Sequence, residues 1–150
     1  MMDALAWLEQ TRVSAFVRED FYAYFVLLIL HAWGMALLVG GGLAVNLRLL
    51  GVAGGTRIDR FAAFFPYIRV GAVLAVLSGI GLLAGYPAKA LTNWVFALKF
   101  ALLVGAAMAL RFSWARQSRP LAALSIALWL GGVAAGKLLL YTYSMLMTTD

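Results

Sequence analysis

A run of 26 almost unbroken apolar residues, Phe21 to Asn46, most constrains how this chain can fold. As an α-helix it would span about 39 Å at 1.5 Å per residue, more than the ~30 Å of a bilayer's hydrocarbon core. Arg48 closes the run, and His31, the one histidine in the chain, lies near its middle. The run therefore predicts a membrane-spanning helix that is long enough to tilt.

The rest of the chain is apolar too, since 65% of its residues are hydrophobic and 12% are charged. Soluble domains have about 25% charged residues, so the chain reads as an integral membrane protein that contacts the lipid bilayer. The net charge of +6 is explained by basic loops that set orientation, and nucleic acid is not an expected partner. The chain has no cysteine, which excludes disulfides and thiol chemistry.

Hydropathy predicts an all-α fold: one transmembrane domain, residues 1–150, that forms an integral membrane four-helix bundle with up-down topology. The expected spans are about 21–47, 67–85, 94–111 and 121–143. An amphipathic helix over 3–18 precedes them, and it either lies in the membrane interface or packs on the bundle. The first span is expected to serve as the insertion signal, because residues 1–20 lack the pattern of a signal peptide.

Basic residues predict the orientation of the bundle. The segment after the first span (48–69) has four arginines and one aspartate, and the segment after the third (111–119) has three arginines and no acid. The positive-inside rule puts both segments in the cytoplasm and both termini in the periplasm. The expected localisation is the bacterial inner membrane, with several passes.

His31 is the strongest candidate for chemistry, because an ionisable side chain near mid-membrane is a functional hypothesis by default. Three interpretations stay open: a neutral histidine hydrogen-bonded to a neighbouring helix, an axial haem ligand, or a group in proton or quinone chemistry. A haem with two axial ligands would need a methionine, a lysine, another subunit or a second copy.

Lys99 and Lys137 are the other ionisable residues within spans, and both lie toward the outer ends of their helices. One interpretation is snorkelling, in which each ammonium reaches the outer head groups. The other is a cationic pocket for an anion, such as a haem propionate, a lipid phosphate or an acidic residue of a partner. No acidic residue inside a span is available to pair with them.

Small residues mark the faces expected to pack against other helices. Gly71 and Gly79 lie on one face of the second span, and Gly132 and Gly136 form a small-xxx-small pair in the fourth. We expect a leucine at Gly132 or Gly136 to block assembly. Asn46 and Ser78 are isolated polar residues suited to hydrogen bonds between helices. Trp33 and Trp129 lie deep inside spans, where an indole N–H needs a partner.

The stretch from His31 to Gly41, HAWGMALLVGG, and the following NLRLLG over 46–51 resemble a family of small bacterial four-helix inner-membrane proteins of unestablished function. That family is distantly similar to the CopD-type copper-resistance membrane domain and to four-helix b-type cytochromes. The stretch TNWVFALK, ending at Lys99, fits the same pattern. The resemblance implies a four-helix bundle in which His31 faces a haem or a metal. This chain departs from the family pattern at Ser113, where relatives often have a histidine.

The inventory disfavours a self-contained enzyme, because no carboxylate is buried in a span and no nucleophile–base pair or metal cluster is present in the sequence. No catalytic or metal-ligating residue is assigned. The first expectation is a non-catalytic subunit or assembly partner of a larger bacterial redox or bioenergetic membrane complex, joined to other subunits or to copies of itself. The alternative is a b-type haem electron-transfer protein that uses His31, with haem b as the candidate cofactor. A transporter of a small solute or metal is the weaker alternative.

Overall fold

The computed structural model describes residues 7–146, and that part of the chain is all-helical. Four helices dominate: α3 (Phe21–Leu50), α4 (Phe64–Gly85), α6 (Trp94–Arg116) and α7 (Arg119–Leu146). All four are long and apolar enough to cross a membrane, so the chain is a multi-pass membrane protein. This confirms the all-α, four-helix part of the prediction.

Local signals set where these helices begin and end. Asp20 caps α3, because its Oδ1 accepts a hydrogen bond from the Ala23 amide at 2.7 Å. The helix continues past the predicted end and stops at Gly51, whose φ of 108° favours glycine. Asn93 caps α6 in the same way as Asp20, and α6 runs on to Arg116 before Gln117 turns left-handed at φ 48°. The helices are longer than the predicted spans. Hydropathy identifies only the part of a helix that crosses the hydrocarbon, whereas the capping residues determine where the helix ends.

Three short helices fill the connections. A 3-10 helix, η1 (Ile58–Ala63), precedes α4, and α5 (Pro87–Leu91) begins with a proline at its first turn. At the amino end, α2 (Arg12–Glu19) is capped by Thr11. The structure therefore differs from the predicted helix over 3–18: the described part has a break at 10–11, where the Thr11 side chain starts a new helix. Residues 3–6 of that prediction lie outside the described residues.

Helix α2 packs across the end of α4. The Ser14 hydroxyl donates to the Gly85 carbonyl at 3.2 Å, and Val17 fills the space left open by the missing side chain of Gly85. Val13 and Phe16 remain exposed on the other face of α2. The two interpretations of this segment therefore combine, since one face packs on the bundle and the other is free to enter the interface.

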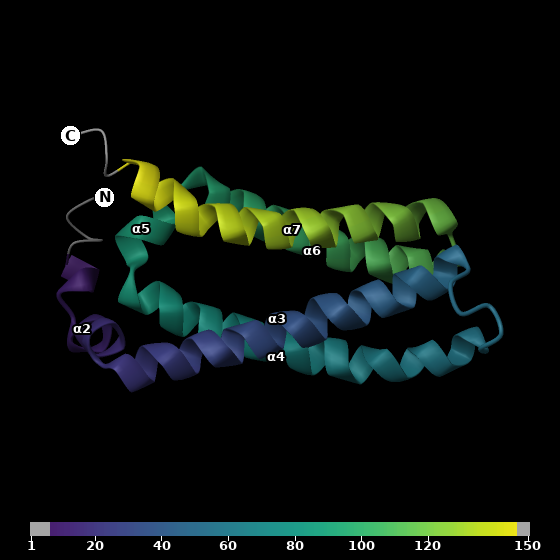
Figure 1. The fold of residues 1–150 in the computed structure, drawn as a ribbon, viewed down its shortest axis with the longest axis horizontal. Coiled ribbons are helices and arrows are strands. Elements are labelled where there is room, and N and C mark those ends of the chain that lie inside the picture. Colours follow the sequence, from purple (N-terminus) through teal and green to yellow (C-terminus); the bar gives the residue numbers. More distant parts are fainter. Residues whose placement is uncertain (1–6, 147–150) are drawn as a thin grey trace.

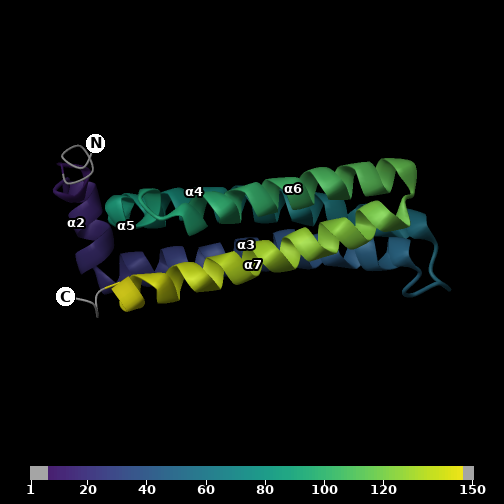
Figure 2. The same cartoon turned by 90° about the horizontal axis from the view of Figure 1, so that it is seen from above.

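The four long helices form two antiparallel hairpins, α3–α4 and α6–α7 (Figures 1 and 2). Helix α3 joins them, because it contacts α7 and α6 while α4 makes no extensive contact with either. Helix α2 and the end of α7 lie at the same end of the bundle (Figure 1).

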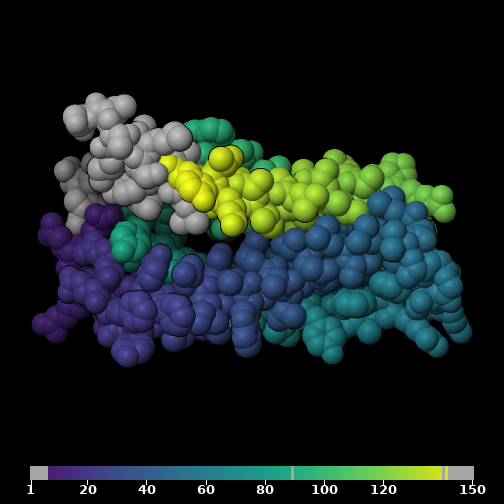
Figure 3. All heavy atoms as spheres, viewed as in Figure 1, coloured from purple at the N-terminus to yellow at the C-terminus, as the bar shows by residue number. Residues whose placement is uncertain are grey.

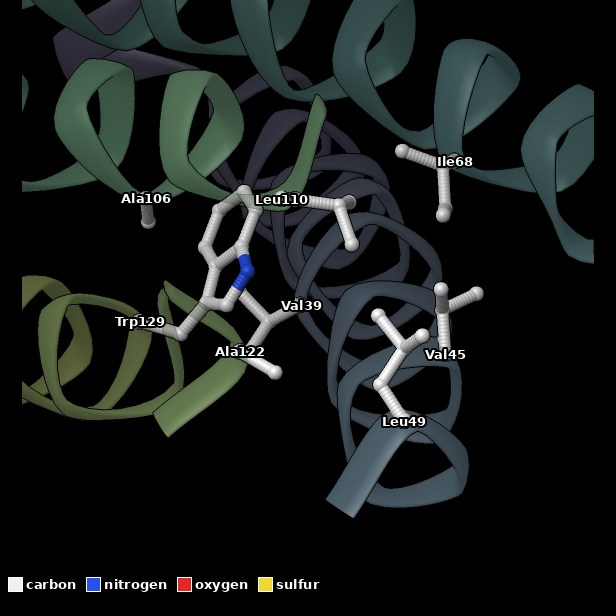
Figure 4. Packing of buried hydrophobic residues seen from close by; sticks show 8 residues of the cluster. All are labelled: Val39, Val45, Leu49, Ile68, Ala106, Leu110, Ala122 and Trp129. Atoms are coloured by element: carbon white, nitrogen blue, oxygen red, sulfur yellow. The ribbon is translucent and has the colours of Figure 1, made fainter. Parts of the chain in front are cut away.

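The main hydrophobic cluster lies toward the end of the bundle near η1, which we call the closed half. Figure 4 shows the buried indole of Trp129 among side chains from the other hairpin and from α6. The Trp129 ring fits against α3 because residue 42 is a glycine, and a Cβ there would lie 2.7 Å from the indole nitrogen. The core cluster consists of Val39, Val45, Leu49, Ile68, Ala106, Leu110, Ala122 and Trp129.

A buried polar cluster ties α3 to both helices of the other hairpin in the closed half. The Asn46 amide donates to Ser125 Oγ on α7 at 2.8 Å, and the Ser113 hydroxyl on α6 donates to Asn46 Oδ1 at 3.1 Å. Ser125 also donates to the Ala106 carbonyl of α6. These three side chains are fully buried and all bonded. The prediction that Asn46 makes hydrogen bonds between helices is confirmed.

The opposite end, which we call the open half and which includes Leu28, His31 and Lys99, is not filled in the same way. Leu28 lies seven residues before Met35 and points in nearly the same direction from α3. Met35 packs against the core cluster, whereas Leu28 is 45% exposed. Figure 3 shows a hollow between α3 and α7 in this half. The two hairpins are therefore joined at one end and parted at the other.

Candidate functional site

His31 is held by α4 through its Nδ1 atom. Nδ1 lies 3.0 Å from the Ala75 carbonyl oxygen and 3.2 Å from Ser78 Oγ. A carbonyl oxygen only accepts, so Nδ1 must carry the hydrogen. The Ser78 hydroxyl is already donating to the Leu74 carbonyl, so its oxygen is free to accept as well. The prediction that Ser78 makes hydrogen bonds between helices is confirmed.

This anchoring fixes what the other ring nitrogen can do. With the hydrogen on Nδ1, the Nε2 atom of a neutral imidazole has a lone pair. Among the described residues, Nε2 has no hydrogen-bond partner. A backbone carbonyl behind Nδ1 is also the usual support of a histidine that ligates a metal through Nε2. The imidazole is therefore prepared to accept a hydrogen bond or to bind a metal.

Lys99 lies on α6, in the other hairpin, where its side chain packs beside Gly136 of α7. Its side chain is partly buried, and it makes no salt bridge within the described part of the chain. Of the two lysines that the sequence singled out, Lys99 is therefore the one whose side chain lies partly inside the bundle.

Two glycines make room for this pair. A Cβ at Gly79 of α4 would lie 3.3 Å from His31 Cε1, and a Cβ at Gly136 of α7 would lie 3.4 Å from Lys99 Cε and 3.6 Å from its Nζ. Both glycines were predicted as helix-packing residues, and here each packs against a polar side chain. His31 and Gly79 thus pack together in the first hairpin, and Lys99 and Gly136 pack together in the second. We call this part of the bundle the His31–Lys99 site.

Lys137 is not part of this site. It follows Gly136 on α7, about 100° further around the helix, and its side chain is exposed. Lys137 lies at the same level of the bundle as Lys99. A substitution that removes the charge of Lys137 is therefore a matched control for the same substitution at Lys99.

The other predicted packing glycines hold the hairpins together. A Cβ at Gly71 would lie 2.5 Å from the Leu38 backbone nitrogen, so α3 and α4 touch backbone to backbone there. A Cβ at Gly132 would lie 2.6 Å from Leu103 Cδ2 of α6 in the same chain. A leucine at Gly132 would therefore disturb the fold itself, which gives a different reason for any loss of assembly.

Ser113, where the resemblance suggests a histidine in relatives, lies far from His31. It bonds to Asn46, which is fifteen residues after His31 on α3, or about 22 Å along the helix axis. The Ser113 position thus belongs to the polar cluster of the closed half. A ligand at this position could not share a metal with His31.

The fit of a haem to these residues is incomplete. His31 provides one nitrogen ligand, and Lys99 provides a cation that suits a propionate. A second axial methionine is not in place: Met35 packs in the core and Met108 is exposed. Met145 and Met147 lie outside the residues whose side chains are described. No group of three or more His, Cys, Asp or Glu side chains that could hold a metal ion occurs in the described part of the chain.

Trp33 has a position that sequence reasoning did not distinguish from that of Trp129. Trp129 is fully buried, whereas Trp33 is 67% exposed in the middle of α3. Helical spacing could have indicated that Trp33 is exposed, because Trp33 is offset from the face of α3 that packs against α4 through Gly34, Leu38 and Gly41. Trp129 occupies the inward face of α7, and its buried Nε1 has no hydrogen-bond partner among the described residues, contrary to the expectation for an indole N–H inside a span.

Comparison of the chain with protein-family models, with curated proteins and with solved structures finds no match.

Proposed function

We propose that this chain is a non-catalytic integral membrane subunit, or assembly partner, of a larger membrane complex. Trp33 carries the proposal. Its indole lies exposed near mid-membrane, and its N–H has no acceptor among the described residues. Lipid tails offer no acceptor either, and an unbonded polar group in hydrocarbon costs several kcal/mol, roughly. A helix of another subunit would supply the missing acceptor.

The residues beside Trp33 support close approach of such a helix. Ala36 and Gly40 follow at helical spacing and are exposed, and no heavy atom lies within 4 Å of the place where a Gly40 Cβ would be. Small residues let two helix backbones come close in a membrane. The redox or bioenergetic character of the complex is proposed from the resemblance to cytochrome-like membrane domains.

Gly40→Leu tests this surface without touching the chain's own packing. The leucine has open space in the isolated chain, and it would raise helix propensity. We expect the variant to fold normally and to lose proteins that copurify with the wild type from native membranes at fixed stoichiometry. Trp33→Leu should weaken the same copurification. If both variants retain the same partners in the same ratio, this face is not the interface.

A b-type haem protein is the second candidate, and the Nδ1–H anchoring of His31 favours it because it leaves Nε2 free. Absorption spectra of gently purified protein, oxidised and dithionite-reduced, test it. A haem ligated by this chain should give a reduced b-type band that is lost in His31→Leu and retained in Gly40→Leu. A colourless preparation that keeps its partner proteins would leave the subunit function standing and remove the haem.

A further inference from the structure

A groove lies in the angle between α2 and the first two turns of α3. Its volume is about 470 Å³, which is within the range of roughly 300–1,000 Å³ for sites that bind small molecules. Phe16 and Val17 line it from α2, and Ala23, Val26 and Leu27 line it from α3. The groove is therefore an apolar site large enough for part of a lipid.

Two of the less exposed lining side chains pack on glycines of α4. A Cβ at Gly85 would lie 2.8 Å from Val17 Cγ1, and a Cβ at Gly81 would lie 2.8 Å from Leu27 Cδ2. The hydrogen bond from Ser14 to the Gly85 carbonyl also holds α2 against α4. The groove is thus built into the fold, because both of its walls are fixed on the same neighbouring helix.

The other lining side chains leave the groove open toward the bilayer. Phe16 of α2 is 61% exposed, and Tyr22 and Val26 of α3 are 76% and 52% exposed. Leu27 lies seven residues after Asp20, the residue that joins the two helices, so the groove extends about 10 Å along α3. One leaflet contributes about 15 Å of hydrocarbon, half of the bilayer's ~30 Å. The groove therefore lies within the leaflet on the α2 side.

Helix α2 limits what can lie in the groove. It runs across the end of the bundle and not along it (Figures 1 and 2). A membrane-spanning helix that packed on α3 at this level would continue toward the head groups and meet α2. An acyl chain lies wholly within the hydrocarbon, and its head group would lie at the level of α2. The groove therefore suits an acyl chain better than a helix of another subunit.

Two carboxylates lie where the groove meets the head groups. Glu19 ends α2 and Asp20 lines the groove, and neither forms a salt bridge within the described part of the chain. The neighbouring cation, Arg18, is engaged elsewhere, because its guanidinium donates to the Glu9 carbonyl at 2.9 Å. Carboxylates attract an ammonium and repel a second anion. The charges beside the groove therefore favour a head group that carries an ammonium.

We propose that the groove between α2 and α3 binds one acyl chain of a phospholipid whose head group carries an ammonium. Phe16 and Val26 flank the chain, and the carboxylates of Glu19 and Asp20 attract the head group. This site is separate from the partner surface around Trp33, so it does not depend on the proposed function.

Native mass spectrometry of the full chain in detergent tests the proposal by titration with phospholipids that differ only in head group. We expect the first phosphatidylethanolamine to bind about threefold more tightly than the first phosphatidylglycerol, a factor typical of an exposed ion pair. Ala23→Phe fills the groove and should weaken this binding at least about tenfold, because two excluded methylene groups already account for that factor. Ala32→Phe is the matched control: it adds the same ring to an exposed position of α3 outside the groove, and it should bind like the wild type.

Asp20→Asn separates the effect of charge from an effect on the fold. Asparagine caps a helix as well as aspartate does, so α3 should keep its start while the charge is lost. The preference for phosphatidylethanolamine should fall in this variant and stay unchanged in Asp59→Asn, at the other end of the bundle. Each variant is first shown to elute as a single species.

Three results would overturn the proposal. The first is equal lipid binding by Ala23→Phe and the wild type, or a loss as large in Ala32→Phe. The second is equal affinity for phosphatidylethanolamine and phosphatidylglycerol in the wild type. The third is a dimer of the chain that is lost in Ala23→Phe, which would assign the groove to a second copy.

Discussion

At the scale of single residues, the glycines of α3 differ sharply although they adjoin one another in sequence. Gly42 faces the Trp129 ring, where a Cβ would meet three ring atoms within 3.3 Å, while Gly40 faces open space. The ring is fully buried in the core and cannot swing away. We expect Gly42→Ala to destabilise the protein by about 1–3 kcal/mol, the usual cost of overpacking.

Gly40→Ala is the matched control for this prediction. It adds the same methyl group to the same helix, and it should leave stability unchanged or raise it by up to about 1 kcal/mol through helix propensity. Thermal unfolding in detergent, followed by tryptophan fluorescence, measures both variants. Equal melting temperatures for the two variants would show that the ring at position 129 is not confined by α3.

Sequence reasoning could find His31 and Lys99, but not which helix each side chain packs against. Each stands out because ionisable residues are rare in spans. Lys99 and Lys137 could not be ranked, because both lie a few residues from an outer helix end. The difference between them is a rotation about a helix axis, which depends on tertiary packing. The tautomer of His31 could not be predicted from the sequence either, because the Ala75 carbonyl and the Ser78 hydroxyl that determine it belong to another helix.

At the scale of helices, Asn46 is the polar link between the two hairpins. Ser113 and Ser125 each have another acceptor, so losing the asparagine breaks the bonds to α3 and leaves the α6–α7 pair bonded. We expect Asn46→Leu, which is similar in volume, to destabilise the protein by about 1–2 kcal/mol, since buried hydrogen bonds in membranes average ~0.6 and reach ~1.7 kcal/mol.

The same variant should also loosen the hairpins relative to each other. The absence of native cysteines allows spin labels at two introduced cysteines, one at Leu77 of α4 and one at Phe100 of α6, both exposed. We expect a broader distance distribution in Asn46→Leu than in the labelled parent. A label pair within one hairpin, Leu77 and Trp33, should keep its distribution. An unchanged distribution for both pairs would mean that apolar packing alone joins the hairpins.

The sequence predicted that the four long helices exist, but it did not predict how long each of them is. Apolar runs longer than the hydrocarbon core predict spans because unbonded backbone cannot cross lipid. The extra turns of α3 and α6 lie in segments that hydropathy treats as loops, and their ends are set by Gly51 and Gln117. The break at 10–11 was missed because the apolar spacing of residues 3–18 continues through it, while the Thr11 cap is a local polar signal.

At the scale of the whole molecule, the parting of the two hairpins is the feature that sequence did not indicate. The closed half packs small and large residues against each other, as Gly42 and Trp129 show. Of the long helices, α4 packs mainly on α3, and it meets α6 at the Phe65–Trp114 ring pair. The parting is thus a property of the arrangement of helices and not of any one helix.

Orientation decides which leaflet the open half faces, and the arginines predict it. Arg48, Arg57, Arg60 and Arg69 lie on the segment around η1, where Asp59 pairs with Arg57 at the surface. We expect a cysteine introduced at Gly55 to react with a membrane-impermeant maleimide only after cells are permeabilised. A cysteine at Thr92, at the other end of the bundle, should react in intact spheroplasts. Both positions are exposed, so accessibility in the fold does not limit either reaction. The reverse pattern would place the arginines outside and the open half of the bundle in the cytoplasmic leaflet.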